Sequence, residues 1–496
     1  MKKTLLIAAV AMTSAVAMAD TDGATYEPVN GFTCTNDWII DRFHTGDEAF
    51  QALSFNQVST DIEVSAASPN NARTCTFWDD EKGVIGAAGK TYLIVAWSCI
   101  GKAGEYPTLV YYDIENGKEA KFQRLKQNGE NAVIWKGANN VGVDAAGNLY
   151  VSGLLIDFVK IPEGGEPTFN QYPIYLVDPA TGDLSEVASL QYAEDDADAT
   201  LNGRLDYIAV DGDLTGKTAC CTVIGGLTKT TQFPIIVGWH REQGGEWAPY
   251  FEEGTMATLK IDIAANPDLT VPKAAKSFGD GCSAEIMKSD DYAADMFYID
   301  GNATFFSLYD KTGDLVEGWN SEGVVTADGP KEAGVNGVKE ITFGGKHFII
   351  YALNQYTAPT FCQLRIAEMG GENNDMLAGC KAYFDVPAQG TGTSLGFGKQ
   401  SDGGNRIAGI CMKVIKDANG VEALKLGSFK TNNGMAVYTI AAPGYNAGVN
   451  DVISDADANA PVEYFNLQGV SVNADNLTPG LYITRQGKTV AKKIVK

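Results

Sequence analysis

The stretch NNVGVDAAGNLYVSGL (139–154) contains two short apolar runs separated by turn-forming residues. Val141 and Val143 alternate with small or polar neighbours, as residues of a half-buried β-strand do. Residues 145–148 are turn formers, and a second apolar run begins at Leu149. Two short strands joined by a tight turn make a β-hairpin, so this stretch predicts antiparallel β-structure.

A second turn type ends the same unit, in VDPATGD (177–183). Its Asp can cap the turn, its Pro fixes φ, and its Gly accepts a left-handed conformation. Both turn types recur along the chain. A Gly-Lys or Gly-Asn pair precedes an apolar run at 89–90, 147–148, 216–217, 301–302, 345–346 and 404–405. An Asp-containing turn with a Gly near its end recurs at 112–118, 177–183, 309–314 and 416–420.

The spacing of these markers is irregular, but it has the scale of one four-stranded antiparallel unit with a variable loop. Residues 75–440 show no sustained helical periodicity, so we expect no long helices. We therefore predict an all-β chain: a β-propeller of about six four-stranded blades (five to seven) over 75–440, followed by a small C-terminal β module. A pair of β-sandwiches, whose hairpins use the same turn residues, is the alternative.

One unit of this repeat also resembles a known group of proteins. The sequence VDAAGNLYV…IYLVDPATGDL, between residues 143 and 184, resembles NHL-like secreted β-propellers, and the rest of the chain shares only the rhythm. The resemblance implies a propeller fold. It implies no activity, because one fold hosts many unrelated functions.

The N-terminus has the features of a targeting segment. Lys2 and Lys3 precede a short apolar stretch and a small-x-small sequence, which predicts a signal peptide over residues 1–19, cleaved after Ala19. No later segment is apolar for long enough to span a bilayer, so we expect no transmembrane segment in the mature chain.

Three further segments flank the repeat. Residues 20–74 form an N-terminal segment, in which DWIIDRF (37–43) is a candidate strand that closes the ring by pairing with the last blade. Residues 441–460 are rich in Gly, Asn and Asp, which predicts a linker. Residues 461–496 then form the C-terminal β module, with a type II turn at Pro479-Gly480 and a hairpin around 486–487.

This module resembles the C-terminal sorting domain of the type IX secretion system of Bacteroidetes. The residues that carry the resemblance are Phe465, Asn466, Leu467, Gln468, Gly469, Gly480 and Tyr482, with a closing Lys pattern at 492–496. The resemblance implies an exported protein, at the cell surface or extracellular, whose tail binds the secretion machinery. If the tail is not a working signal, the protein is periplasmic. A three-stranded appendage without a sorting role is the alternative.

Charge and composition exclude several classes of partner and cofactor. The formal net charge of −24 argues against nucleic acid, which requires concentrated Lys and Arg. The three His residues stand far apart and in no metal-binding motif, so we expect no metal and no cofactor. The nine Cys residues are an odd number for an exported chain, and Cys34–Cys75 and Cys362–Cys380 are the pairings that we guess.

Two aromatic-polar stretches, 75–83 and 237–254, are the candidate ligand-binding loops. Aromatic rings can stack on the apolar face of a sugar while polar groups bind its hydroxyls. The alternative is that the Trp side chains pack between blades. The candidate residues are Trp78, Asp79, Asp80, Trp239, His240, Arg241, Trp247 and Tyr250.

These observations favour a surface-associated propeller that binds a glycan or a protein without catalysis. Its possible ligands are therefore a glycan or a partner protein. A glycan-cleaving propeller that uses carboxylates from different blades is the enzymatic alternative. A structural component of the cell surface is the third. No catalytic residue is assigned from the sequence.

Overall fold

The computed structural model describes residues 31–41, 73–97, 107–115, 117, 120–132, 138–153, 157–158, 169–193, 205–212, 221–227, 235–241, 245–250, 258–260, 283–286, 296–301, 304–318, 334–354, 364–369, 381–386, 408–430, 434–446, 462–466, 471–474, 477–486 and 489–495. They belong to two compact units, one within 31–415 and 423–443 and the other within 416–422 and 444–495. The predicted signal peptide and most of the predicted linker lie outside the described residues. Within the described part of the chain, no helix is long and apolar enough to cross a membrane.

In the larger unit, the described strands form six consecutive antiparallel blades. Blade 1 consists of β2 (Cys75–Asp80), β3 (Lys90–Trp97), β4 (Thr108–Asp113) and β5 (Ala120–Arg124), and the short hairpin of β6 (Lys126–Gln127) and β7 (Glu130–Asn131) follows it. Blade 2 consists of β8 (Ala138–Val143), β9 (Leu149–Gly153), β11 (Phe169–Val177) and β12 (Leu184–Ala193), and β10 (Asp157–Phe158) also pairs with β11. Blade 3 consists of β13 (Leu205–Gly212), β14 (Cys221–Leu227) and β15 (Ile235–Arg241), with β16 (Ala248–Pro249) and β17 (Thr258–Lys260) on its outer edge.

The remaining three blades repeat this order. Blade 4 consists of β18 (Ser283–Ile286), β19 (Met296–Gly301), β20 (Thr304–Asp310) and β21 (Leu315–Gly318). Blade 5 consists of β22 (Gly334–Phe343), β23 (Lys346–Asn354), β24 (Leu364–Glu368) and β25 (Lys381–Val386). Blade 6 consists of β26 (Ala408–Lys416), β27 (Glu422–Lys430), β28 (Gly434–Ala441) and, from the other end of the chain, β1 (Thr33–Asp41).

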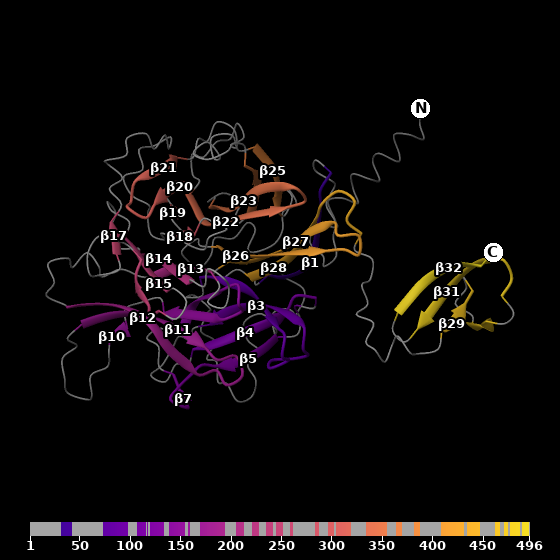
Figure 1. The fold of residues 1–496 in the computed structure, drawn as a ribbon, viewed down its shortest axis with the longest axis horizontal. Coiled ribbons are helices and arrows are strands. Elements are labelled where there is room, and N and C mark those ends of the chain that lie inside the picture. The colour runs from indigo at the N-terminus through magenta and orange to yellow at the C-terminus, as the bar shows by residue number, and fades with distance from the viewer. Residues whose placement is uncertain are drawn as a thin grey trace. The chain divides into compact units, whose positions relative to one another are not determined.

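Consecutive blades contact one another, and the last contacts the first. The contacts that join them are, in chain order, Val141 N–H to the Thr74 hydroxyl at 2.6 Å, Ala145 N–H to Gly212 O at 2.7 Å, the Tyr207 hydroxyl to Glu285 at 3.1 Å, the strand pair Gly301 and Val335, the rings of Phe343 and Phe32 with centroids 5.5 Å apart, and the sulfurs of Cys411 and Cys75 at 3.5 Å. Figure 1 shows the six sheets in chain order around a common centre. The closed cycle of blades is a β-propeller, so the predicted fold is confirmed. The alternative interpretation, a pair of β-sandwiches, was wrong.

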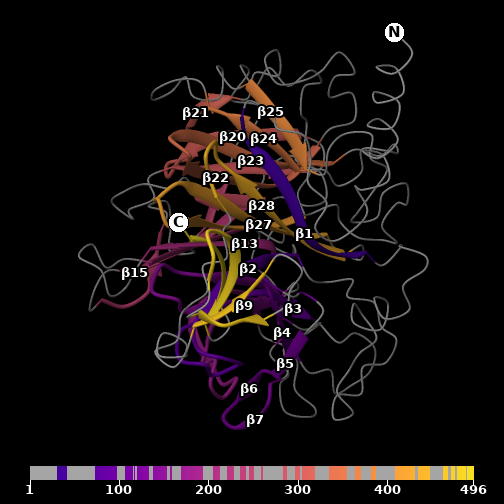
Figure 2. The ribbon, with the colours of Figure 1, turned by 90° about the vertical axis from the view of Figure 1, so that its right-hand side faces the viewer.

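The N-terminal strand β1 closes the ring. It pairs antiparallel with β28, from Thr33 opposite Ala441 to Asp41 opposite Gly434, as the outermost strand of blade 6 (Figure 2). The buried Trp38 of β1 donates its indole N–H to the carbonyl of Ile114 in blade 1 at 2.8 Å. The strand predicted over 37–43 thus begins earlier, at Thr33, and joins the last blade to the first.

The Asp-containing turns have the predicted mechanism. Asp178, Asp310 and Asp417 of the predicted turns, and Asp144 of the first hairpin, each accept, on a side-chain oxygen, the backbone N–H two residues later, at 2.8–3.0 Å. These four turns also contain a Gly with φ between +79° and +90°, a conformation that residues with a Cβ rarely adopt. In the turn predicted at 112–118, Asp113 accepts the N–H of Glu115 at 3.0 Å, and part of that turn lies outside the described residues. Sequence alone predicted these turns because all of their interactions are local.

The Gly-Lys and Gly-Asn markers do not occupy one fixed place in the blade. The pairs at 89–90, 147–148 and 345–346 lie between the first and second strands of blades 1, 2 and 5. Gly301 instead ends β19, before the third strand of blade 4. The markers at 216–217 and 404–405 lie outside the described residues.

The two faces of the ring differ in their connections. In an antiparallel meander, the turns from first to second strand and from third to fourth strand lie at one face. The other connections lie at the opposite face, which we call the loop face. The four Asp turns all belong to the first face. The long connections 42–74, 261–282, 319–333 and 387–407 all begin and end at the loop face, where functional residues of such a scaffold are expected.

The C-terminal module is a separate antiparallel sheet with the strand order β30-β29-β31-β32. Its strands are β29 (Val462–Phe465), β30 (Ser471–Val472), β31 (Gly480–Gln486) and β32 (Thr489–Val495). The hairpin predicted around 486–487 is confirmed, since Gln486 pairs with Thr489. The prediction of a type II turn at 479–480 was wrong, because Gly480 is the first residue of β31 and is not among the glycines with positive φ.

Candidate functional site

The first predicted ligand-binding stretch forms the strand β2 and not a loop. Trp78 is only 6% exposed and donates its indole N–H to Gly147 O of blade 2 at 2.9 Å. Its ring packs edge-on against Tyr111, with centroids 5.9 Å apart. Trp78 therefore fills the seam between blades 1 and 2, and the interpretation of an exposed sugar-stacking ring was wrong for this residue.

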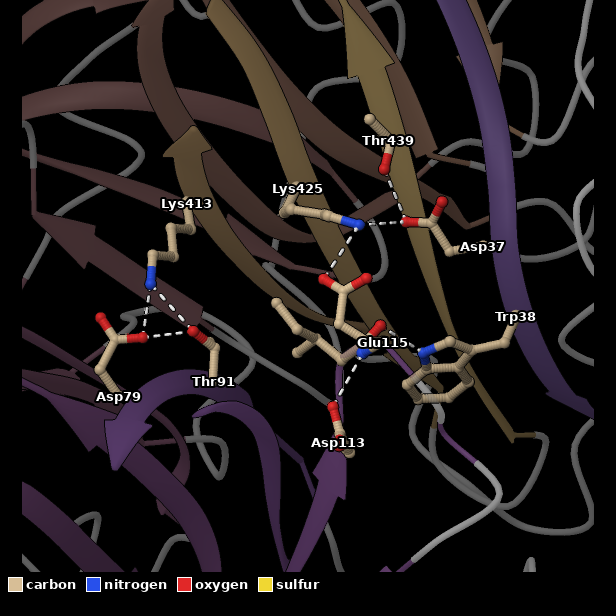
Figure 3. Close-up of polar contacts among 10 residues, drawn as sticks. Asp37, Trp38, Asp79, Thr91, Asp113, Glu115, Lys413, Lys425 and Thr439 are labelled. Carbon is tan, nitrogen blue, oxygen red and sulfur yellow. Dashed lines mark hydrogen bonds and ion pairs between the residues drawn. The ribbon is translucent and has the colours of Figure 1, made fainter. Parts of the chain in front are cut away.

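The two carboxylates that follow Trp78 have structural partners. The exposed Asp79 forms an ion pair with Lys413 of blade 6 and accepts a hydrogen bond from Thr91, as Figure 3 shows. Asp80 is fully buried and accepts the backbone N–H groups of residues 84, 85 and 86 at 2.7–2.9 Å. Burial raises the pKa of Asp80, but these N–H groups together hold it below its ordinary value.

The second predicted stretch is strand only in part: its residues 237–241 belong to β15 and 248–249 to β16, and Trp247 lies outside both strands. Trp239, His240 and Arg241 end β15, where Trp239 is 4% exposed and pairs with Pro249 of β16. Trp247 is half-buried and packs edge-on against Tyr150 of blade 2, with centroids 6.3 Å apart. The interpretation of an exposed loop was thus wrong for Trp239, whose buried ring is not available to stack on a ligand.

The remaining residues of this stretch have contacts within blade 3. Arg241 donates its Nε–H to Gly245 O at 2.8 Å, and the rings of His240 and Tyr250 lie 6.2 Å apart. The eight predicted ligand-binding residues therefore belong to blades 1 and 3, on either side of blade 2.

Of the residues that resemble a sorting motif, four are described. Phe465 ends β29, and the Arg485 guanidinium lies 5.4 Å from the centre of its ring. Asn466 follows β29, Gly480 begins β31, and the Tyr482 hydroxyl donates to Thr478 O at 3.0 Å. Leu467, Gln468 and Gly469 lie outside the described residues.

The seam between blades 6 and 1 holds a buried cation. Lys425 of β27 contacts Asp37 of β1 at 3.0 Å and Glu115 of blade 1 at 3.6 Å, and Thr439 donates to the same Asp37 oxygen at 2.7 Å (Figure 3). Burial raises the pKa of Asp37, and the charge of Lys425 opposes that effect. These groups form ion pairs and hydrogen bonds with one another, so we interpret them as part of the ring closure.

A different group of side chains lies where three innermost strands converge. The Tyr207 hydroxyl of β13 donates to Glu285 Oε2 of β18 at 3.1 Å. Lys339 Nζ of β22 lies 2.5 Å from the same oxygen and 5.9 Å from the centre of the Tyr207 ring. Tyr207 and Lys339 belong to blades 3 and 5, which are not neighbours, so they can meet only across blade 4, close to the axis. We call these three residues the axial cluster.

The three residues of the axial cluster differ in burial. Tyr207 is 2% exposed and Glu285 6%, whereas the side chain of Lys339 is 23% exposed. Burial raises the pKa of Glu285, the nearby Asp211 raises it further, and Lys339 and the Tyr207 hydroxyl lower it, with a net increase. A buried carboxyl with a raised pKa and a specific charged partner is typical of functional sites.

The arrangement also has the geometry of an activated nucleophile. A hydroxyl is hydrogen-bonded to a base, and a third group orients that base. Here Tyr207 supplies the hydroxyl, Glu285 the base and Lys339 the orienting cation. Tyr207 stands third of the eight residues of β13, near the end at the loop face, and Glu285 stands third of the four residues of β18.

A second Tyr–Glu pair provides a useful comparison. The Tyr298 hydroxyl of β19 donates to Glu340 Oε2 at 2.9 Å, and His347 Nε2 lies 2.5 Å from Glu340 Oε1. These residues belong to the neighbouring blades 4 and 5, so the pair is explained by packing across one seam. Among the described residues, no three His, Cys, Asp or Glu side chains gather to hold a metal ion.

Sequence comparison places the chain in no known group: no protein-family model and no characterised protein matches it. Among solved structures, an α-L-arabinanase of Penicillium chrysogenum is 11% identical, with 76% of this chain and 99% of that chain covered and a TM-score of 0.37. An α-L-arabinofuranosidase of Fusarium graminearum is also 11% identical, with 76% and 95% covered and a TM-score of 0.38. The subtype N11 neuraminidase-like protein of a flat-faced bat virus is 10% identical, with 79% and 97% covered and a TM-score of 0.36. Likenesses with such low TM-scores do not establish a relationship. The propeller fold is therefore assigned from the chain's own sheet topology.

The axial cluster was missed from the sequence because its residues carry no local signal. Tyr207, Glu285 and Lys339 lie in ordinary apolar strand segments, far apart in the chain. Only the blade order brings them together. The useful signal would have been a charged residue inside an innermost strand, since such a side chain must find a partner when it is buried.

Proposed function

We propose that this β-propeller cleaves a glycan at the axial cluster. The single observation that supports the proposal is the Tyr207 hydroxyl hydrogen-bonded to the buried Glu285, whose same oxygen contacts Lys339 at 2.5 Å. Glycoside cleavage needs a nucleophile or base beside the acetal carbon and a proton donor for the leaving oxygen. The axial cluster offers the Tyr207 phenol for the first role and the Glu285 carboxyl for the second.

In this reaction Glu285 acts as a base on Tyr207. The carboxylate takes the phenol proton while the phenol oxygen attacks the acetal carbon and the glycosidic C–O bond breaks. The protonated Glu285 then gives this proton to the leaving oxygen. In the second step water attacks the same carbon and loses a proton to Glu285, the C–O bond to Tyr207 breaks, and Glu285 returns the proton to the phenol oxygen. Lys339 keeps Glu285 oriented and favours its ionised form.

A glycan-binding module without catalysis is the second candidate. The observation that favours it is the partly exposed ammonium group of Lys339, whose side chain is 23% exposed, because a cationic donor at the axis can bind sugar hydroxyls without cleaving the glycan. The two candidates share a place and a ligand class. Product formation separates them.

The experiment is a screen of the purified full-length protein against a panel of polysaccharides: arabinan, xylan, mannan, pectin, an α-glucan and peptidoglycan. We expect new reducing ends from at least one of them and a large loss of this activity in Tyr207→Phe. A polysaccharide that binds the protein but yields no product supports the second candidate. A folded wild-type protein that neither binds nor cleaves any of them contradicts both.

We also propose that the protein is exported to the cell surface and that the C-terminal module is its sorting signal. The support is the resemblance of the tail and the separate sheet that the module forms. The secretion machinery is then the partner of this module.

A further inference from the structure

Two buried thiols meet at the place where the ring closes. Cys75 begins β2, the innermost strand of the first blade, and Cys411 lies in β26, the innermost strand of the last. Their sulfurs are 3.5 Å apart, although 336 residues separate them in the chain. Each side chain is 5% exposed, and both cysteines carry free thiols. Cys34 and Cys75 do not form the guessed pair, since both thiols are free and Cys75 lies against Cys411. The other guessed pair, Cys362–Cys380, lies outside the described residues.

The backbone around the two thiols holds them close together. A Cβ on Gly409 of β26 would lie 2.6 Å from the backbone nitrogen of Cys75, so only glycine allows the two strands to approach in this way. A Cβ on Gly427 of β27 would lie 2.5 Å from the sulfur of Cys411. The pair therefore sits between strands that are already in contact, and a small rotation of the side chains can bring the sulfurs to the bonding distance of about 2.05 Å.

We propose that Cys75 and Cys411 are the site of a disulfide bond that links the first and last blades covalently. A disulfide-bearing oxidant, such as oxidised glutathione or a thiol–disulfide oxidoreductase, supplies the oxidising equivalents. One thiolate attacks the oxidant to give a mixed disulfide, and the second displaces the oxidant's remaining thiol. The protein loses two protons and two electrons, one S–S bond forms between the strands, and the oxidant leaves as two thiols.

The bond would reinforce a closure that is otherwise non-covalent. The strand β1 closes blade 6 at its outer edge, whereas the bond would join the innermost strands of blades 6 and 1. A crosslink across such a long stretch of chain restricts the unfolded state strongly. The inference does not depend on the proposed glycan cleavage.

Burial decides when the bond can form. Burial and the neighbouring Cys75 raise the pKa of the Cys411 thiol, so little thiolate is present in the folded protein. Oxidation is therefore expected during folding, while the seam is open, and is expected to be slow once the ring has closed.

The test uses the full-length chain, refolded from denaturant in a buffer of reduced and oxidised glutathione. Trypsin cleaves after Lys and Arg, so Cys75 falls in TCTFWDDEK (74–82) and Cys411 in IAGICMK (407–413), each with a single Cys. We expect these two peptides as one disulfide-linked species by mass spectrometry, and as separate peptides after reduction. Their recovery as separate alkylated peptides, with the folded protein in the same buffer, would overturn the proposal.

Melting curves provide the second measurement. Oxidation should raise the Tm of the wild type by about 5 °C, and reduction should remove the rise. Cys75→Ala and Cys411→Ala should show no such rise, whereas the control Cys34→Ala, which removes another buried thiol, should keep it. A rise that survives in Cys411→Ala belongs to another pair of cysteines and overturns the assignment. The peptide measurement on the wild type stays decisive if a variant fails to fold.

Discussion

At the residue scale, Asp80 shows how one buried carboxylate organises a turn of the propeller. It ends β2 and accepts three consecutive backbone N–H groups of the segment that leads to β3. An Asn at this position keeps the shape of the side chain but loses the charge and replaces one acceptor oxygen with a donor. We expect Asp80→Asn to lower the free energy of unfolding at pH 7 by about 1–3 kcal/mol.

The pH dependence of this loss has a definite sign. Because the pKa of Asp80 is lower in the folded state, its stabilisation is complete above the ordinary value of 3.8 and is lost as the pH falls through the lower value. Urea unfolding of the wild type and of Asp80→Asn at several pH values should therefore show a difference that shrinks in acid. The neighbouring Asp79→Asn, which breaks an exposed pair, should cost at most about 1 kcal/mol. Equal costs for the two variants would contradict this role of Asp80.

The pKa of Glu285 gives a second prediction at this scale. As a base it must be ionised, so kcat/KM should fall on the acid side below its pKa, which lies above the ordinary value of 4.5. Lys339→Met removes the charge that favours ionisation and should move this limb of the pH profile to higher pH. The control Lys346→Met breaks the pair of Lys346 with Glu368 and should leave the limb in place. An unmoved limb in Lys339→Met would count against Glu285 as the base.

At the element scale, the closing strand β1 depends on the fit of one side chain. Trp38 packs so closely over Gly117 that a Cβ on this glycine would overlap the indole ring. We expect Gly117→Ala to cost about 1–3 kcal/mol of stability through overpacking. The same substitution in a Trp38→Leu background should cost less, since the smaller side chain leaves room for the methyl group. Additive costs in denaturant unfolding of the four proteins would show that this contact does not constrain the strand.

The elements show which parts of the fold can be predicted from sequence. The turn at Asp144 was predicted because its cap and its glycine act within five residues. The stretch 237–254 was misread as a loop because its polar and aromatic residues hide the strands β15 and β16. Trp239 is buried by packing that no local pattern reports, so its burial had to come from the structure.

At the scale of the whole molecule, the order of the blades determines which distant residues meet at the axis, and the sequence does not show this. The six blades were predicted from the rhythm of the turns, but the axial cluster joins Tyr207, Glu285 and Lys339 from three different blades. Such a site depends on the closure of the ring. The sequence therefore predicted the architecture well and the position of the candidate site poorly.

The C-terminal module leads to a prediction about the whole chain. A variant that lacks residues 461–496 keeps the hydrogen bond from Asn446 N–H to Asp417 at 2.9 Å, and the sheet that it loses is complete in itself. We expect the variant to fold with a Tm within about 2 °C of the wild type. In a host with a type IX secretion system, it should accumulate in the periplasm, whereas the full-length protein reaches the surface. Cell fractionation checks this expectation. Surface delivery of the truncated protein, or its failure to fold, would remove the sorting role.

The Glu285 carboxyl has the leading role in the proposed cleavage, and one kinetic comparison tests that role. The measurement is kcat/KM of the wild type, Glu285→Gln and Glu340→Gln on the polysaccharide that the screen identifies. Both glutamates are buried and bonded to a tyrosine, but only Glu285 lies in the axial cluster. We predict a loss of about 10²–10⁴-fold for folded Glu285→Gln and a change of only a few-fold for Glu340→Gln. Equal activity of Glu285→Gln and the wild type would contradict that role.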